Sequence, residues 1–530
     1  MKYNIKISLL AILAMINLAS CTKKLDLFPT NELTPDKVYA TPEGYRKSIA
    51  KVYSAYTLTG SDGPGTSDVP EIKDPGFSDF YRQFWYLQEF PTDEAIVRWT
   101  NDAGLQDFHN LSWTSDNQFI RGSYYRGLYQ INVANDFIRQ STPEKIASRN
   151  IAGTDAETIA KYNVEARFLR AYQYWVLMDL FGNPPFVTEK DAIGSSKPQQ
   201  IKRADLFKYI ESELLAIEPL MIAARANQYG RADRGACEAL LARIYLNAEV
   251  YTGIPKYAEA ATYAKKVIDA GYTLINNYRE LMLADNHLNT SENILSLPYD
   301  GNYTQNYGGT TTLINGPMGG SMIPANSGMF TNTSWAGIRT TPEIINLYVD
   351  LTFNSDTRAQ FFTQNQKKEI DDFFDFTNGY PSTKYKNKTR TGANGSNGEF
   401  SDVDMPLFRL AEMYLIYAEA HLRSNTGDAN TALTYLNKLR ERAYGNTSGN
   451  ITMAQMTKDY IIDERGRELF WEGHRRTDLI RYDKFTDGSY LWAWKGGVKN
   501  GTSTSAYRKI FPIPITDIIV NNNLKQNPNY

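Results

Sequence analysis

The chain has 530 residues, of which 42% are hydrophobic, so it is long enough to bury a large core. Its formal net charge is -2 with both signs interspersed, which argues against nucleic acid or an anionic lipid surface as a partner. Aromatic residues make up 13% of the chain, including 36 Tyr and 8 Trp, and such residues in loops are favoured in binding surfaces.

Residues 1–20 have the layout of a secretory signal peptide. Lys2 and Lys6 form a short basic start, and residues 7–16 are apolar and uncharged. Small residues follow before position 21. The apolar stretch is too short to span a bilayer, so we expect residues 1–20 to be cleaved after export.

Residues 18–21 read Leu-Ala-Ser-Cys, which matches the lipobox of bacterial lipoproteins. We expect Cys21 to carry the lipid and residues 21–34 to form a tether; the alternative is an ordinary cleaved signal in which Cys21 has no role. Several acyl chains make a stable anchor, because each buried methylene contributes about 0.8 kcal/mol. Cys237 would then be the one remaining cysteine, so we expect no disulfide.

Helical spacing of apolar residues recurs along residues 35–530, which we expect to form a single domain. The expected helices are 42–58, 119–139, 155–181, 204–224, 231–251, 255–270, 405–424, 428–443 and 453–475. Small and large residues alternate over 236–245 and 257–267, which allows close helix crossings as in tetratricopeptide repeats. We therefore predict a mainly α fold with tetratricopeptide-like helix pairs, without a regular array.

Two segments between the helical blocks, 301–337 and 378–402, are rich in Gly, Asn, Thr and Ser. Such segments cannot form amphipathic helices, so we expect long irregular loops with short strands. Loops of this length are often functional. Tyr303, Tyr307 and Trp335 lie within the first segment, which disfavours the alternative of a flexible linker.

Motifs of common enzymes are missing from the sequence, among them Gly-x-Ser-x-Gly, the P-loop and His-Glu-x-x-His. Asp93 and Glu94 are adjacent carboxylates, which we interpret as capping or loop-bonding residues. Asp402 and Asp404 could offer oxygens to a calcium ion, but a polar turn is the favoured interpretation. The sequence therefore predicts no enzyme, no cofactor and no metal site.

Several blocks of sequence together indicate a family. They are MPLFRLAEMYLIYAE at 405–419, ERGRELFWEGHRRTDLIR at 464–481, ARFLRAYQY at 166–174, FPIP at 511–514 and NPN at 527–529. With the lipobox, these blocks resemble the SusD/RagB family of outer-membrane lipoproteins over essentially the whole mature chain. The resemblance implies a SusD-like fold with an N-terminal part over about 21–230 and a C-terminal RagB/SusD part over about 231–530.

The charges of 464–481 have a structural interpretation. Arg and Glu alternate so that they can pair along a helix and its following turn, while Leu469, Phe470 and Leu479 face inward. We therefore expect this block to hold the fold together and to form no binding site.

Within the family the chain is most similar to the starch-binding member, in which an arc of three aromatic residues cradles the curve of an α-glucan. The matching positions here are Trp99, Tyr307 and Trp335. A polar partner of the first aromatic residue falls at Asp102, or at Asn101 with a slip of one, and Arg82 matches a further sugar-contacting arginine.

Two departures from that member stand out. The stretch between Trp335 and Asp402 is shorter here, so a wall of the site is missing or rebuilt. Some members bind calcium near the positions of Asp402 and Asp404, but a further carboxylate position is His287 here, so we predict no metal.

The resemblance implies a non-catalytic protein, anchored by lipid in the outer membrane and facing the cell exterior. Such a protein would bind a glycan, here a starch-derived α-glucan or maltooligosaccharide, and deliver it to a SusC-type TonB-dependent transporter. The same role for a different glycan is the first alternative, because a fold does not fix its ligand. A glycoside hydrolase and a surface adhesin are remoter alternatives.

Overall fold

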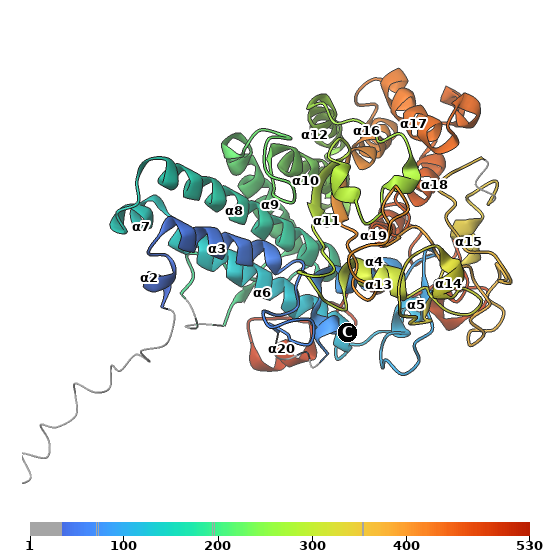
Figure 1. The fold of residues 1–530 in the computed structure, drawn as a ribbon, viewed down its shortest axis with the longest axis horizontal. Coiled ribbons are helices and arrows are strands. Elements are labelled where there is room, and N and C mark those ends of the chain that lie inside the picture. Colours follow the sequence, from blue (N-terminus) through green and yellow to red (C-terminus); the bar gives the residue numbers. More distant parts are fainter. Residues whose placement is uncertain (1–33, 70–71, 73, 193, 195–196, 352–354) are drawn as a thin grey trace, which may run out of the picture.

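The computed structural model describes residues 34–69, 72, 74–192, 194, 197–351 and 355–530. Cys21 and nearly all of the expected signal peptide and tether lie outside these residues. Figure 1 shows a helical molecule in which α8, α9, α10 and α12 lead to α16, α17 and α18, while α4, α5, α13 and α14 lie with loops below them. No helix in the described ranges is long and apolar enough to cross a membrane.

The α-helices account for most of the regular structure. Their bounds are α2 Pro35–Val38, α3 Pro42–Ser54, α4 Phe80–Glu89, α5 Asp107–Asn110, α6 Gln118–Gln140, α7 Pro143–Ser148, α8 Gly153–Phe181, α9 Arg203–Ile217, α10 Arg234–Leu246, α11 Ala248–Thr252, α12 Tyr257–Asp269, α13 Gly309–Asn315, α14 Pro324–Ser327, α15 Pro342–Ile345, α16 Leu410–Ser424, α17 Ala429–Tyr444, α18 Lys458–Glu468, α19 Arg475–Arg481 and α20 Ile515–Val520. Short 3-10 turns connect several of them.

Helices α6, α8, α9, α10, α12, α16 and α17 pack against one another in succession, which confirms the predicted helical scaffold. Close crossings depend on small side chains: Ala236 and Ala239 of α10 and Ala260 and Ala264 of α12 are all fully buried. The helices begin where the sequence supplies caps. One example is α10, where the Asp233 side chain accepts a hydrogen bond from the Ala236 N–H at 3.2 Å.

Three antiparallel strand pairs join segments that are far apart in the sequence. Strand β1 (Ile96–Val97) pairs with β5 (Ile338–Arg339), β2 (Pro185–Phe186) with β3 (Gln199–Gln200), and β4 (Asn293–Leu297) with β6 (Met405–Arg409). The β1–β5 pair places Val97 opposite Ile338, so it brings the residues after β1 beside those before β5.

The helix expected over 405–424 begins only at Leu410, because the first five residues form β6. The one over 204–224 ends at Ile217, before a 3-10 turn that contains Pro219. A proline lacks the N–H that continues a helix, which accounts for this end.

Two further expected helices are interrupted. The one over 231–251 breaks at Asn247, whose amide donates to the Arg243 carbonyl at 3.0 Å. The one over 453–475 divides into a 3-10 turn, α18 and a bend before α19, because Trp471 and Gly473 adopt positive φ angles of 62° and 82°.

The segment 301–337 is more ordered than the loop that we expected. It contains α13 and α14, and β5 begins directly after it. Every residue of α13 is buried, so the segment lacks the alternation between apolar and polar faces that reveals a surface helix.

The charges of the 464–481 block form the predicted ion pairs at Arg467–Glu464 and Arg465–Asp478, but the network is buried and extends to other elements. Glu468 accepts hydrogen bonds from Arg409 at 2.6 Å and from Arg442 at 2.5 Å, and its side chain is fully buried. Burial alone would raise the pKa of Glu468, but Arg442 and Arg409 hold it below its ordinary value. Leu469, Phe470 and Leu479 are buried as expected.

Candidate functional site

The N-terminus of α4 is the base of the site. The Asp79 side chain caps this helix, accepting from the Arg82 N–H at 2.7 Å, and it also accepts from the Gly309 N–H at 2.8 Å. One buried carboxylate oxygen therefore ties α4 to the start of α13, next to Tyr307.

Arg82 connects two of the predicted aromatic residues. Its Nη1 donates to the Tyr307 carbonyl at 2.9 Å, and its guanidinium carbon lies 5.7 Å from the centre of the Trp335 ring. Its Nε donates to the Tyr86 hydroxyl at 2.8 Å, which fixes the plane of the group. Arg82 is only 7% exposed, so it forms the floor between the two rings.

The β1–β5 pair brings Trp99 and Trp335 together. The Arg98 N–H donates to the Gly337 carbonyl at 2.9 Å, which continues the pairing beyond the strands. The Trp99 indole N–H then donates to the Trp335 carbonyl at 2.8 Å. The two ring centres lie 6.4 Å apart with the planes inclined by 59°, so they form an angled surface.

Gly337 makes this arrangement possible. A β-carbon at this position would lie 2.0 Å from indole atoms of Trp99. Only a residue without a side chain lets the Trp99 ring lie flat against the backbone after Trp335.

Tyr307 completes the group of aromatic residues. Its side chain is 36% exposed, and its ring lies against Phe400 with 5.3 Å between the ring centres. Burial and the carboxylate of Glu399 both raise the pKa of the Tyr307 phenol, so the phenol stays protonated at neutral pH. The three rings, Trp99, Tyr307 and Trp335, are called the triad below.

The two predicted polar partners lie beside the triad. Asn101 is exposed and Asp102 is half-buried, and neither side chain forms a hydrogen bond to residues within the described ranges. Burial raises the pKa of Asp102, and the nearby Arg82 guanidinium opposes that rise. The structure therefore brings Arg82, Asp102 and the triad together and leaves the Asn101 side chain in solvent.

Sequence analysis missed several residues that support the triad, namely Asp79, Gly337, Gly76 and Phe400. Asp79 precedes a helix and has the signature of an N-cap, which could have been found once α4 was recognised. A β-carbon at Gly76 would lie 2.6 Å from Nη1 of Arg82 and 3.3 Å from Cβ of Tyr307. No sequence pattern predicts such close approaches, because they depend on the folded chain.

Asp93 and Glu94 have structural roles, as expected. The Asp93 carboxylate accepts two hydrogen bonds of 2.7 Å from Arg475, and Glu94 accepts from the Trp471 N–H at 2.6 Å. Both carboxylates are buried, so neither faces a ligand.

Asp402 and Asp404 also accept hydrogen bonds from the protein. Asp402 accepts from the Gly301 N–H at 2.7 Å, and Asp404 accepts from the Tyr229 hydroxyl at 2.5 Å and the Tyr299 N–H at 2.7 Å. Burial raises the pKa of Asp404 to about 6. Residues 401–404 form no turn and Asp404 is buried, so the polar turn that the sequence favoured is not observed; these carboxylates instead bond to distant segments.

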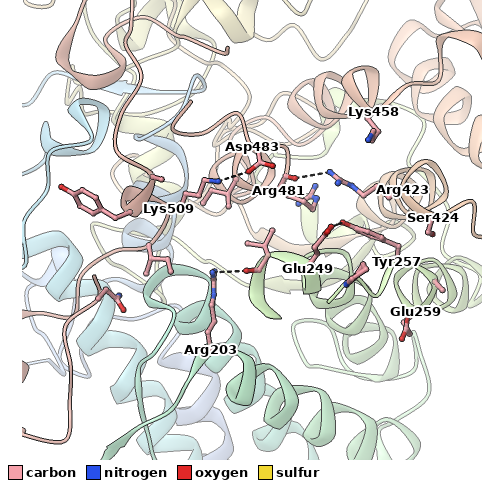
Figure 2. A pocket seen from close by; sticks show the side chains of 18 of the residues that line it. Arg203, Glu249, Tyr257, Glu259, Arg423, Ser424, Lys458, Arg481, Asp483 and Lys509 are labelled. Carbon is pink, nitrogen blue, oxygen red and sulfur yellow. Dashed lines mark hydrogen bonds and ion pairs between the residues drawn. The ribbon is translucent and has the colours of Figure 1, made fainter. Parts of the chain in front are cut away.

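A cavity of about 1050 Å³ lies on another part of the molecule, between helices α9, α11, α12, α16 and α19 and the segment that contains Lys509 (Figure 2). Its charged groups already bind protein atoms. Arg203 donates to the Met178 carbonyl at 3.1 Å, and Lys509 pairs with Asp483 at 2.9 Å. This cavity therefore offers few free charges to a ligand.

Comparison with known proteins identifies two matching families. Residues 350–530 match the SusD family, and residues 80–246 match a family described as starch-binding and associating with the outer membrane. The starch-binding protein SusD of Bacteroides thetaiotaomicron is 35% identical to this chain, covering 99% of this chain and 98% of that protein. SusD-like protein P25 of Formosa agariphila is 26% identical, covering 95% and 94%.

Solved structures show the same fold. A SusD homolog from Bacteroides thetaiotaomicron has a TM-score of 0.72 at 20% identity, covering 94% of this chain and 99% of that one. Surface glycan-binding protein A from the same organism, in complex with laminarihexaose, has a TM-score of 0.69 at 19% identity, covering 92% and 99%. Because the 35% identity to SusD extends over nearly the full length of both proteins, this chain belongs to the SusD family.

Proposed function

We propose that the chain is a non-catalytic, lipid-anchored protein of the outer membrane that binds a starch-derived α-glucan and delivers it to a SusC-type TonB-dependent transporter. The observation that carries this proposal is the triad, whose residues come from distant parts of the chain: Arg82 contacts the Trp335 ring and the Tyr307 carbonyl, and Trp99 packs beside Trp335. The lipid anchor, the outer membrane and the transporter are inferred from the similarity of this chain to its relatives.

The triad has the chemistry that an α-glucan requires. Each pyranose ring has an apolar C–H face that packs on an aromatic plane, and its hydroxyl groups need hydrogen bonds at the edges. Trp99 and Trp335 are inclined by 59°, so successive sugar rings of a curved chain can each meet an aromatic face. Asn101 and Asp102 supply hydrogen-bonding groups at the edge, with Arg82 beneath.

An α-glucan is the first choice because the relative with 35% identity is a starch-binding protein. The same role for a β-glucan is the second candidate, since two proteins of similar fold bind laminarihexaose or laminarin. Those proteins are only 19% and 21% identical to this chain, so starch takes precedence.

Calorimetry against a panel of glycans tests the ligand class. The panel contains maltooligosaccharides, cyclodextrins, laminarioligosaccharides, pectins, xylans and host glycans. Binding heat with maltoheptaose and cyclodextrin supports the proposal. If these give no heat while another polymer does, the α-glucan assignment is wrong. Release of reducing ends on long incubation would instead support a hydrolase.

Substitution of the triad tests the site. Trp99→Ala and Trp335→Ala should each weaken α-glucan binding at least about tenfold, equivalent to about 1.4 kcal/mol, and leave the melting temperature nearly unchanged. Tyr507→Ala, an aromatic change in the cavity of Figure 2, is the matched control and should bind normally. A large loss of stability without a selective loss of binding would mark both tryptophans as packing residues.

The delivery step has a separate test. The chain should co-purify with a TonB-dependent transporter from outer membranes, and deletion of either protein should abolish growth on the bound glycan. Normal uptake without this chain would contradict the delivery role and would leave the binding assignment intact.

A further inference from the structure

A second cavity, of about 780 Å³, lies between α3, α8, the turn at 228–231, the end of β4 and the segment 299–304. Five tyrosine side chains line it, namely Tyr53, Tyr56, Tyr162, Tyr229 and Tyr299. Its volume is within the range of ligand sites, roughly 300–1000 Å³. Like the triad, this cavity presents aromatic side chains.

The tyrosine walls of this cavity are held rigidly. The Tyr53 hydroxyl donates to Glu165 at 2.6 Å, that of Tyr56 donates to the Leu169 carbonyl at 2.9 Å, and that of Tyr229 donates to Asp404 at 2.5 Å. Because their hydroxyl groups are bonded to the protein, these rings are fixed; Tyr53 and Tyr229 are accessible to a ligand, whereas Tyr56 is only 2% exposed and packs within the wall. A ligand that packs against Tyr53 or Tyr229 does not have to order these side chains first.

The ring of Tyr162 is held in place by Arg231. The guanidinium carbon of Arg231 lies 4.8 Å from the centre of the Tyr162 ring, and Arg231 forms two hydrogen bonds with Glu165. Glu165 also accepts from Tyr53, so a single buried carboxylate orients Tyr53 directly and Tyr162 through Arg231.

The rim of the cavity offers both donors and acceptors to a ligand. Nε2 of Gln228, the His287 ring and Oδ2 of Asp300 form no hydrogen bond to any residue that the structure describes. Hydroxyl groups of a sugar both donate and accept, and they need such a mixed set.

The charges at the cavity disfavour an anionic ligand. Two cations line it, and each is already paired: Arg46 with Glu43 at 2.6 Å and Arg231 with Glu165 at 2.5 Å. Neither guanidinium is therefore available as the partner of an anionic ligand.

The cavity borders the loop that carries Tyr307 of the triad. Asp300 and Thr304 line the cavity, and Tyr307 follows three residues after Thr304, so their Cα atoms are at most about 11 Å apart. Between them Tyr303 is 85% exposed. The Asn306 amide donates to the carbonyl of Thr57, another lining residue, at 2.6 Å, which fixes this loop to the cavity wall.

We propose that this cavity is a second glycan-binding subsite, which holds a neutral segment of the same oligosaccharide that the triad binds, with Tyr303 between the two. This inference rests on the proposed function. It implies that a long oligosaccharide gains contacts at the cavity that a short one cannot reach from the triad.

The test uses variants that separate the two regions. Trp99→Ala with Trp335→Ala removes two rings of the triad. Ala50→Arg fills the cavity from an exposed lining position on α3, and Gln228→Ala with His287→Ala removes rim hydrogen bonds. Ala147→Arg, on an exposed position of α7 that does not line the cavity, is the matched control.

Calorimetry of the full mature chain with maltotriose, maltohexaose and amylose gives the readout, with laminarihexaose in parallel. We expect the triad double variant to retain weak binding of maltohexaose and the further Ala50→Arg change to abolish it. In the parent, Ala50→Arg and the rim double variant should each lower amylose affinity about tenfold and leave maltotriose affinity unchanged, whereas Ala147→Arg should change neither.

Two other outcomes are distinguishable. If the parent binds glycan but the triad double variant binds none, and Ala50→Arg has no effect on amylose, the cavity is no subsite and the inference is wrong. If the parent binds no glycan of any length, the proposed function fails and the inference fails with it. Circular dichroism and the melting temperature of each variant establish that it is folded.

Discussion

Gly337 shows how much the geometry of the triad depends on one residue. Its backbone lies against the Trp99 indole, and Arg98 and Trp99 bond to the carbonyls of Gly337 and Trp335. Sequence comparison alone places Trp99 and Trp335 among the candidates. It cannot show that their rings touch, because the contact depends on the β1–β5 register and on the absence of a side chain at 337.

Gly337→Ala should displace Trp99, because the new methyl group would lie 2.0 Å from indole atoms. We expect glycan affinity to fall at least about tenfold and the unfolding free energy to fall by about 1–3 kcal/mol, as for other overpacked sites. Calorimetry and denaturant titration measure both. Gly65→Ala, where a β-carbon meets nothing within 4 Å, is the control and should bind normally. Unchanged affinity in Gly337→Ala would show that the indole position is irrelevant to binding.

Two buried carboxyl groups, Glu89 and Glu94, make stability depend on pH. Glu89 is fully buried and accepts hydrogen bonds from the Gly473 N–H at 2.7 Å and the His474 N–H at 3.0 Å. Burial nevertheless raises the pKa of Glu89 to about 8 and also raises the pKa of Glu94, which the charge of Glu89 raises further. The folded chain therefore keeps a proton that the unfolded chain loses above its ordinary pKa of 4.5.

The unfolding free energy should consequently fall as pH rises from about 4.5 to about 8, by at most about 1.4 kcal/mol per pH unit for this proton. The stabilisation from this proton is complete below the pKa of Glu89 in the unfolded chain, 4.5. It is lost as the pH rises toward the pKa in the folded chain, about 8. Glu89→Gln should flatten this dependence, and Glu157→Gln on the surface of α8 should leave it unchanged. Urea titrations at several pH values between about 5 and 8 measure the pH dependence of the unfolding free energy in each variant. This range lies roughly between the two pKa values of Glu89. An identical slope in Glu89→Gln and the parent would rule out this pair as its origin.

Among the elements, α4 and β6 show why sequence prediction fell short. All ten residues of α4 are buried, the polar Arg82, Gln83 and Glu89 among them, so its polar residues mark no solvent-exposed face. In β6, the residues before Leu410 are also buried throughout and continue the apolar pattern of α16, which hides the boundary. Helices with one exposed face, such as α3, α12 and α17, were placed correctly because burial alternates along them.

Helix α18 depends on its buried ion pairs. Glu468→Gln should leave Arg409 and Arg442 without full compensation in a site from which water is excluded, and we expect the unfolding free energy to fall by about 3–5 kcal/mol. Denaturant titration measures the loss. Asp459 on the same helix pairs with Lys484 at 2.8 Å and its side chain is 80% exposed, so Asp459→Asn should change stability by less than about 1 kcal/mol. Equal effects of the two substitutions would contradict a structural role for the buried network.

For the whole molecule, the anchor proposed at Cys21 would have a function distinct from binding. Cys21 lies outside the described residues, and its lipid is expected to keep the triad beside a transporter. Cys21→Ala should therefore bind glycan in solution with unchanged affinity and fail to support uptake. Growth on the glycan and calorimetry of the purified protein measure the two properties. Normal growth would show that the lipid is dispensable.

The way the triad is assembled has a consequence for the proposed export. Its rings come from positions 99, 307 and 335, and in the folded chain the β1–β5 pair and the bond between Asp79 and Gly309 hold their segments together. If the chain is exported in an extended state, as the proposed signal peptide implies, it has none of these contacts during transfer. On the proposed function, such a precursor would bind no sugar, and binding would begin only after the exported chain has folded.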